Sequence, residues 1–273
     1  MKVSMFDQKV VWITGASSGI GEALAYELSN AGARLILSAR SASELERVQK
    51  SCATQTLVLP LDVTDYAMME AAVKQAQSWK GRIDMLLNNA GISQRSRCVD
   101  TDMQTFRTLF EVDVFAQIAL TKQVLPIMLE QGSGHIAVTA SVAGKIGAPM
   151  RTAYCAAKHA MMGFFDSLRT EVSHQNIKVT TITPGYIRTN ISTNALNGDG
   201  SAYAKLDAEI KSGMSAEECA SVIVRGMRKN KPEIAVGRGL EMHALWLKRL
   251  SPRLVFKLAA KQFHKTLQDS NLK

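Results

Sequence analysis

The sequence predicts a doubly wound α/β protein, in which helices cover both faces of one parallel sheet to give three layers. Short runs rich in Val, Ile, Leu and Thr alternate with longer amphipathic segments. Most of these short runs are apolar on both faces, as strands buried on both sides must be. No repeat or Pro/Gly-rich linker divides the chain, so we expect one domain, residues 1–240, with residues 241–273 as its helical extension.

Seven runs are expected to form the strands. They are residues 9–14, 34–39, 56–61, 84–89, 135–140, 178–183 and 233–237. Three of the intervening helices carry a capping box, in which Ser or Thr precedes Glu or Gln by three positions. The pairs are Ser41 with Glu44, Thr101 with Gln104, and Ser215 with Glu218. The longest irregular stretch, 186–213, is polar and turn-rich, and loops of this length are usually functional, often as lids.

The charge of the chain is basic, with 33 Lys and Arg against 24 Asp and Glu in 273 residues, a formal net charge of +9. This balance suits nucleic acid or an anionic membrane, and it equally suits a phosphorylated cofactor. The chain shows no zinc finger, aromatic RNA-binding motif or basic heptad region. We therefore expect no nucleic-acid partner.

Cysteine usage and hydropathy indicate the compartment. The four cysteines show no C-x-x-C spacing, which argues against a metal site and against a disulfide framework. The amino-terminal stretch lacks the apolar run of a signal peptide, and no window reaches the roughly 18 uninterrupted apolar residues of a membrane span. We expect a cytoplasmic protein without bound metal.

The segment "TGASSGIG", residues 14–21, joins the first strand to a helix. Gly15 permits a tight turn, while Gly19 and Gly21 allow a ligand to approach the backbone closely. The N–H groups and the dipole of the helix N-terminus favour a pyrophosphate, and Ser17 and Ser18 add hydroxyl donors. The alternative is an ordinary glycine-rich turn between a strand and a helix.

The end of the second strand, "LILSARS", indicates which dinucleotide would bind. It lacks the acidic residue that would hold a ribose 2′-hydroxyl, and Arg40, 19 residues after Gly21, suits a 2′-phosphate. We therefore expect NADP(H) in preference to NAD(H). The alternative is an exposed arginine at a helix start.

The stretch "YCAAKHA" places Tyr154 and Lys158 on one face of a helix, because positions four apart share a face. A phenol has an ordinary pKa of about 10, and a nearby ammonium would lower it. At about 4 Å and an effective dielectric constant near 20, that charge is worth roughly 4 kcal/mol, or roughly two to three pKa units. Such a pair also arises by chance, so its use depends on its surroundings.

With these residues in order, the chain resembles the short-chain dehydrogenase/reductase family across nearly all of residues 8–237. "TGASSGIG" resembles the family's T-G-x-x-x-G-x-G loop, "LDVTD" (61–65) its adenine-flanking acid, and "NNAG" (88–91) the segment after its fourth strand. Ser141 precedes Tyr154 by thirteen residues, as in the family, and "PGYIRT" (184–189) resembles its turn at the nicotinamide carboxamide.

The resemblance implies a Rossmann fold and a set of cofactor-binding residues. The set comprises Gly15, Ser17, Ser18, Gly19, Ile20, Gly21, Arg40, Asp62, Val63, Asn89, Ala90, Gly91, Tyr154, Lys158, Pro184, Gly185, Ile187 and Thr189. It also implies a homodimer or homotetramer formed through the helices near 101–131 and 152–175.

The resemblance further implies a mechanism. Ser141 would hydrogen-bond the substrate carbonyl, and Tyr154 would exchange the proton. Lys158 would hold the ribose hydroxyls and make Tyr154 more acidic. The implied activity is hydride transfer between NADP(H) and the carbonyl or secondary alcohol of a small, rather apolar substrate.

One position departs from the family. Where the family has Asn in V-N-x-x-G, this chain has Asp113, within "EVDVFAQ". The family's Asn positions a relay water largely through its main-chain carbonyl, which survives the change, but a carboxylate near Lys158 would partly cancel the charge that acidifies Tyr154. We count Asp113 as catalytic and expect activity with an altered pH profile. The alternative is a dinucleotide-sensing or scaffold protein without turnover.

The C-terminal segment "LEMHALWLKRLSPRLVFKLAAKQFHKTL" is expected to form two helices divided at Ser251 and Pro252, with apolar and basic residues interleaved. Three interpretations are open. The helices could cover the body or a partner subunit, they could form a wall of an apolar substrate pocket, or they could attach peripherally to anionic lipid.

Overall fold

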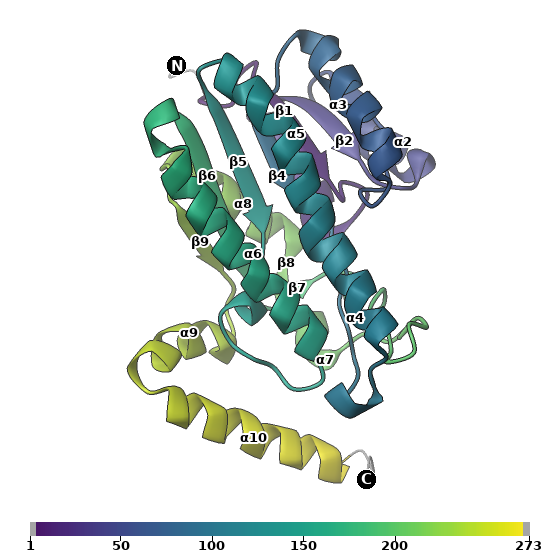
Figure 1. The fold of residues 1–273 in the computed structure, drawn as a ribbon, viewed down its shortest axis with the longest axis vertical. Helices are drawn as coiled ribbons and strands as arrows, with labels where there is room; N and C mark the ends of the chain where they lie inside the picture. Colours follow the sequence, from purple (N-terminus) through teal and green to yellow (C-terminus); the bar gives the residue numbers. More distant parts are fainter. Residues whose placement is uncertain (1–3, 270–273) are drawn as a thin grey trace.

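A computed structural model describes residues 4–269 and contains the predicted parallel sheet (Figure 1). Its seven strands lie in the order β3-β2-β1-β4-β5-β6-β9, and every neighbouring pair is parallel. The strands are β1 (Val10–Thr14), β2 (Arg34–Ser38), β3 (Thr56–Val58), β4 (Met85–Asn88), β5 (Gly134–Thr139), β6 (Ile177–Pro184) and β9 (Glu233–Val236). The order reverses between β1 and β4, where the ends of such strands create a ligand crevice. The predicted fold class is confirmed.

The edge strand β3 is shorter than the predicted 56–61. Pro60 lies at the sheet edge with its nitrogen facing away from β2, where the lack of an N–H is tolerated. The amides of Leu59 and Leu61 still donate to the carbonyls of Leu37 and Ala39, at 2.9 and 3.0 Å. The chain therefore continues beside β2 beyond the assigned strand.

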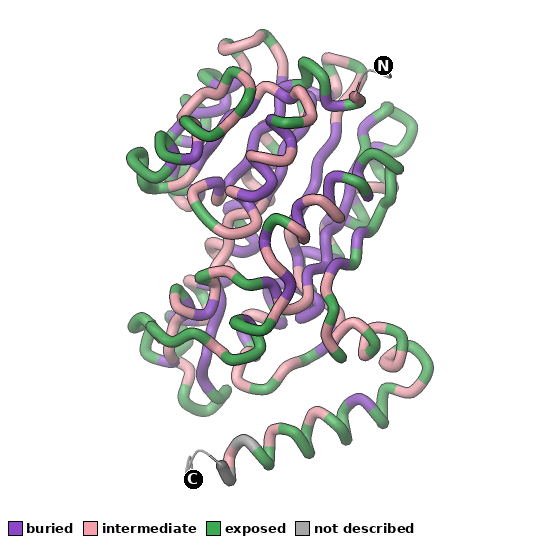
Figure 2. Tube along the Cα trace, turned by 180° about the vertical axis from the view of Figure 1, so that it is seen from behind, coloured by how far each residue is buried: buried purple, intermediate pink, exposed green. Residues whose placement is uncertain are grey.

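Helices cover both faces of the sheet. They are α1 (Gly19–Asn30), α2 (Ala42–Lys50), α3 (Tyr66–Lys80), α4 (Met103–Phe110), α5 (Ala116–Glu130), α6 (Thr152–Glu171), α7 (Ala208–Lys211), α8 (Ala216–Arg228), α9 (Leu240–Leu250) and α10 (Pro252–Asp269). Because side chains alternate along a strand, Val11 and Ile13 pack toward α1, α2 and α8, whereas Val10 and Trp12 pack toward α3, α5 and α6. Figure 2 shows the resulting buried central layer.

Two of the three predicted capping boxes are confirmed. Ser41 and Ser215 accept hydrogen bonds from the amides of Glu44 and Glu218, at 3.4 and 3.2 Å. The prediction for Thr101 is wrong, because α4 begins at Met103 with Asp102 as its N-cap. The Thr101 hydroxyl instead donates to the carbonyl of Arg97 at 2.6 Å and closes the preceding 3₁₀ turn, Cys98–Asp100.

A π-helical turn, Glu111–Phe115, joins α4 to α5 into one run, Met103–Glu130. By length and composition alone this run could cross a membrane, but half of its most apolar window is buried inside the protein. Its residues Leu120, Val124 and Met128 pack against the sheet. We interpret it as a core helix.

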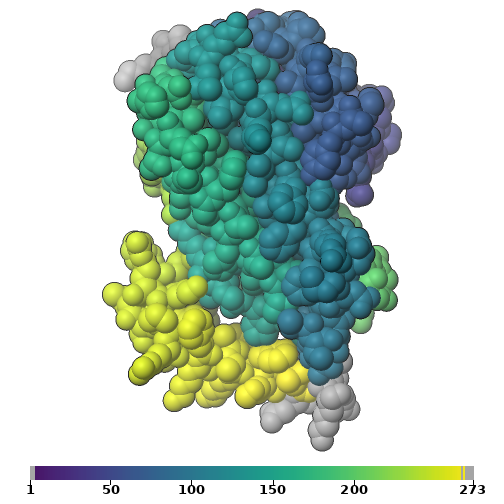
Figure 3. All heavy atoms as spheres, in the orientation of Figure 1, coloured from purple at the N-terminus to yellow at the C-terminus, as the bar shows by residue number. Residues whose placement is uncertain are grey.

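The C-terminal extension forms two helices that break at Ser251, as predicted. They lie at the end of the molecule where the strands terminate (Figures 1 and 3). Three side chains hold them to the loop after β5, because Val142 and Ile146 of that loop and Val255 of α10 are buried together. Met242, Ala244, Leu245 and Leu247 of α9 pack around this cluster.

Candidate functional site

The glycine-rich loop after β1 fits a pyrophosphate. Gly15 and Gly19 have φ of +63° and +58°, which side chains other than glycine rarely tolerate. A Cβ at Gly21 would lie 2.2 Å from the carbonyl oxygen of Gly15. Ser18 is the N-cap of α1, but its side chain does not cap the helix. Side chains at these glycines would fill the space in front of the first N–H groups of α1. With glycine there, that space stays open for a phosphate.

The segment after β4 is fixed against this loop. The Thr14 hydroxyl accepts hydrogen bonds from the amides of Asn89 and Ala90, at 3.0 and 3.1 Å. The Asn89 side chain donates to the carbonyls of Thr14 and Gly15, and Gln117 donates to the carbonyl of Ala90 at 2.7 Å. The sequence predicted Asn89, Ala90 and Gly91 here, but it did not single out Thr14 or Gln117, whose hydrogen bonds hold them in place.

The segment 184–189 also meets the glycine-rich loop. A Cβ at Gly19 would lie 3.0 Å from Cγ2 of Thr189, so the two predicted cofactor segments touch. The side chains of Ile187 and Ile20 pack with the core, which leaves only their backbone for a cofactor. Glu241 of α9 accepts a hydrogen bond from the amide of Tyr186 at 3.2 Å, so the C-terminal extension is attached to this same turn.

The residues expected near the adenosine ribose lie on the rim of the site. Arg40 is exposed and makes no hydrogen bond or ion pair within residues 4–269. Burial acts to raise the pKa of Asp62, but hydrogen bonds from Thr64 and the charge of Arg40 outweigh it and lower the pKa. Val63 is buried and available through its backbone. Arg40 is therefore close to the predicted adenine-flanking acid, with its donors available.

A second arginine braces the outer side of the glycine-rich loop. Arg47 of α2 pairs with Glu22 of α1 at 2.7 Å and donates to the carbonyl of Ser17 at 3.1 Å. The hydrogen bond from Arg47 lowers the pKa of Glu22. Sequence reasoning missed this brace, because Arg47 and Glu22 are 25 positions apart and neither belongs to a motif.

Three of the four residues expected to carry catalysis, Ser141, Tyr154 and Lys158, are placed by α6 and by the loop after β5. Lys158 Nζ lies 5.6 Å from the ring centroid of Tyr154, so the two share a helix face as predicted. Lys158 also donates to the carbonyl of Thr139, at the end of β5, at 3.2 Å. The Ser141 hydroxyl accepts from the amide of Ala143 at 3.1 Å, and its own hydrogen has no acceptor among the described residues.

Asp113 lies in the π-helical turn and contacts Lys158. Its Oδ2 is 3.4 Å from Lys158 Nζ, its Oδ1 accepts from the amide of Ile92 at 2.8 Å, and both side chains are buried. Burial raises the pKa of Asp113, and the Lys158 ammonium offsets this only in part. Burial would lower the pKa of Lys158, but the charges of Asp113 and Tyr154 raise it above its usual value. The carboxylate thus lies against the lysine, as the sequence predicted.

The residues beside Tyr154 and Lys158 have packing roles. Cys155 is buried, its sulfur accepts from the amide of Ala148 at 3.3 Å, and burial raises the pKa of its thiol. His159 is exposed, with Nδ1 2.8 Å from the carbonyl of Cys155.

A second ionic cluster lies near Tyr154, and sequence reasoning missed it. Asp207 pairs with Arg95 at 2.6 Å and with Arg151 at 3.3 Å. Asp207 belongs to the irregular stretch 186–213, whereas Arg95 follows β4 and Arg151 immediately precedes α6. No local pattern joins residues so far apart in the chain.

Comparisons with known proteins agree with this geometry. The family model described as short chain dehydrogenase matches residues 9–199. A Drosophila melanogaster protein named dehydrogenase/reductase SDR family protein 7-like is 43% identical over 261 residues, covering 93% of this chain and 80% of that protein. The human dehydrogenase/reductase SDR family member 7 is 39% identical over 268 residues, covering 95% and 79%.

Among solved structures, the fold is similar to that of a short chain dehydrogenase/reductase from Burkholderia phymatum in complex with NAD. The TM-score is 0.81, with 23% identity over 91% of this chain and 95% of that one. At this identity the likeness concerns the fold.

Proposed function

Because the chain belongs to the short-chain dehydrogenase/reductase family, we propose that it transfers a hydride between NADP(H) and the carbonyl or secondary alcohol of a small, rather apolar substrate. It is an oxidoreductase, and its fold binds a nicotinamide dinucleotide. The observation that carries the proposal is the alignment of Tyr154 and Lys158 on α6 beside the glycine-rich loop.

The roles of the side chains follow from their hydrogen bonds. The bound cofactor supplies or accepts the hydride. The free hydroxyl hydrogen of Ser141 donates to the substrate oxygen, and Tyr154 delivers a proton to that oxygen during reduction or removes it during oxidation. Lys158, held by Thr139 and Asp113, keeps a positive charge near the phenol and so favours the phenolate that proton delivery leaves.

The central test is Tyr154→Phe, assayed with NADPH against a panel of aldehydes and ketones. We expect loss of the hydroxyl to lower kcat by roughly 100- to 10,000-fold, as for a general acid, while NADPH affinity stays within about two-fold. Activity close to that of the wild type would contradict the assigned role. If the wild type binds NADPH tightly but reduces no carbonyl, the alternative of a dinucleotide-sensing protein is favoured, with the buried Asp113 as its structural basis.

The preference for NADP(H) is proposed from Arg40, whose exposed guanidinium suits a 2′-phosphate. Arg40→Asp should weaken NADPH binding by roughly 10- to 100-fold and reverse the preference toward NADH. The matched control is Arg225→Asp, a charge change at an exposed position of α8. Titrations of both cofactors measure the effect, and an unreversed preference rules out the assignment.

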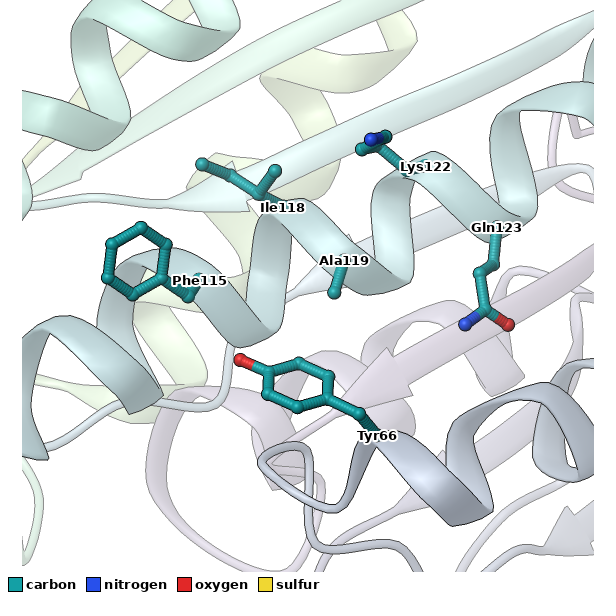
Figure 4. Close-up of a pocket in the computed structure, with 6 residues that line it drawn as sticks. All are labelled: Tyr66, Phe115, Ile118, Ala119, Lys122 and Gln123. Carbon is teal, nitrogen blue, oxygen red and sulfur yellow. The ribbon is translucent and has the colours of Figure 1, made fainter.

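We also propose a homodimer or homotetramer. A depression of about 450 Å³ lies between α3 and the start of α5 (Figure 4). Its lining is mostly apolar: Tyr66, Phe115, Ile118, Ala119, Lys122 and Gln123. Phe115 is 53% exposed, and a second copy packed against this helix would cover it. Light scattering should show that the wild type is an oligomer and that Phe115→Ser is a smaller species. A monomeric wild type would exclude the proposed oligomer.

The interpretations of the C-terminal helices stay proposals, each supported by a different contact or surface of these helices. Their inner side covers the body through the cluster around Val255, and a groove of about 470 Å³ separates α10 from residues 147–155. Lipid contact stays a proposal, supported by the exposed Trp246 and Leu250 beside basic residues. If the wild type and Trp246→Ser co-sediment equally with liposomes, the proposal of lipid contact is wrong. A cytoplasmic location also stays a proposal.

A further inference from the structure

The ionic cluster beside Tyr154 holds more positive than negative groups. The side chains of Arg95, Arg151 and Asp207 are only 7%, 18% and 10% exposed. One carboxylate pairs with two guanidinium groups, so one positive charge lacks a counter-ion within residues 4–269. Because charge is expensive to bury unpaired, such an excess among largely buried side chains indicates an anionic ligand.

The fold places this cluster next to the catalytic tyrosine. The segment 93–96 runs between two others, with the amide of Arg95 donating to Leu196 at 2.8 Å and that of Ser96 to Met150 at 3.0 Å. Arg151 is three residues before Tyr154. Burial chiefly lowers the pKa of Arg95, the charge of Arg151 adds to this, and both Asp207 and the Tyr154 phenol oppose it.

The two arginines differ in the donors that they have left. Arg95 is fully engaged, with Asp207, the Ser93 hydroxyl and the carbonyl of Gln94 as its acceptors. Arg151 forms hydrogen bonds with Asp207, at 3.3 Å, and with the side chain of Tyr186, and its guanidinium carbon lies 5.9 Å from the Tyr186 ring centroid. A guanidinium has about five N–H donors, so Arg151 keeps donors for a further acceptor.

The nearby carboxylates do not cancel the charge of Arg151. Burial is the main cause that raises the pKa of Tyr186, and the charges of Glu209 and Glu241 add to it, so both carboxylates lie near this ring. Neither forms an ion pair with Arg151 among the described residues. Glu241 is occupied by the amide of Tyr186, and Glu209 is exposed on α7.

We propose that Arg151 binds an anionic oxygen group of the carbonyl substrate, with Arg95 and Asp207 holding it in place. This inference rests on the proposed function and narrows its substrate class to carbonyl compounds that combine an apolar body with one carboxylate or phosphate. A guanidinium binds either group through paired N–H donors, and the partial burial of Arg151 strengthens that contact.

The test compares three aldehydes that share one alkyl chain and end in a carboxylate, a phosphate or a methyl ester. With NADPH and the wild type, kcat/KM for one of the anionic aldehydes should exceed that for the ester by roughly 10- to 100-fold. The anionic aldehyde with the higher kcat/KM shows whether Arg151 binds a carboxylate or a phosphate. Arg151→Gln should remove this advantage mainly through KM, and Arg151→Lys should keep part of it. Lys205→Gln, which removes an exposed cation from the 186–213 stretch that carries Asp207, is the matched control and should retain the advantage.

Equal kcat/KM for the ester and both anions, or an equal loss for all three in Arg151→Gln, would overturn the proposal. Binding of the corresponding hydroxy acid to the NADPH-loaded protein, measured by calorimetry, gives a readout without turnover. If that binding depends on Arg151 while no carbonyl is reduced, the proposed reaction fails and the anion site stands. If carbonyls are reduced but neither the hydroxy acid nor its phosphate counterpart binds through Arg151, the proposed reaction stands and the anion site fails.

Discussion

The two buried ionic sites around Tyr154 differ in charge balance and in the elements that build them. Beneath it, Asp113 and Lys158 form a one-to-one pair held by the π-helical turn and α6. Beside it, Asp207 is shared by two arginines that come from loops. In the functions that we propose, the balanced pair acts on the tyrosine and on the cofactor, whereas the unbalanced cluster keeps a charge for a substrate.

This difference separates the groups that regular elements hold from those that loops hold. Regular elements hold the groups that every substrate would need, in one fixed geometry. Loops hold the groups that select among substrates, because loops vary without disturbing the core. The following changes test whether the two sites are separate in this way.

The largest effect is expected from Lys158→Met, which leaves Asp113 buried without its cation. Removing one partner of a buried pair lowers the free energy of unfolding by about 3–5 kcal/mol. Activity should fall by at least about 100-fold, because Tyr154 loses its neighbouring charge. Denaturant unfolding and NADPH oxidation measure the two effects.

The double variant Lys158→Met with Asp113→Asn separates those effects. It removes both charges, so most of the lost stability should return while activity stays low. Recovery of activity together with stability would show that the lysine acts only through the fold.

Asp207→Asn should affect the other site by a smaller amount. It leaves two guanidinium groups in like-charge contact, and we expect a loss of roughly 2–4 kcal/mol of unfolding free energy because Arg151 is partly solvated. Limited proteolysis should cut the 186–213 stretch faster. Asp199→Asn, an exposed acid of that stretch, is the control. A stable, protease-resistant Asp207→Asn would show that the cluster does not hold the loop.

Asp113→Asn tests how the balanced pair acts on Tyr154. Without the carboxylate, the Lys158 charge is no longer partly cancelled, so the phenol should lose its proton more readily. In alcohol oxidation kcat/KM rises with pH as Tyr154 loses its proton, and this rise should move to lower pH by about one unit. An unchanged pH dependence would remove the hypothesis that Asp113 tunes the tyrosine.

The smallest effect is expected in alkaline stability. The pKa of Lys158 is raised on folding, so its stabilising contribution is complete below its unfolded pKa of about 10.4 and is lost as pH rises through the higher folded value. In Asp113→Asn, burial would lower that pKa instead, and stability should begin to decline at a lower pH. Thermal unfolding between about pH 8 and 11 measures this, and identical profiles would contradict it.

The sequence predicted the parts of the site that depend on local spacing. Gly15, Gly19 and Gly21 lie in the short segment that joins β1 to α1, and Tyr154 and Lys158 lie about one helical turn apart on α6. Their arrangement therefore follows from the local backbone. The strands followed from apolar runs, although β3 ends at Val58 and not at the predicted residue 61.

The remaining parts depended on tertiary contacts. Arg95 and Asp207 are 112 positions apart, and nothing in either neighbourhood indicates the other. Thr101 matched a capping box, yet the preceding turn used its hydroxyl first. The attachment of Glu241 to Tyr186 joins the extension to the cofactor side, which no periodicity could show.

That attachment has a practical meaning for handling the protein. The hydrogen bond from Tyr186 to Glu241 ties α9 to the turn 184–189, which we expect to meet the cofactor, while the segment before β1 lies at the opposite end of the sheet (Figure 1). An affinity tag or a fluorescent fusion placed after α10 would therefore lie on the side of the molecule that carries this contact. The same addition before Phe6 would be remote from it.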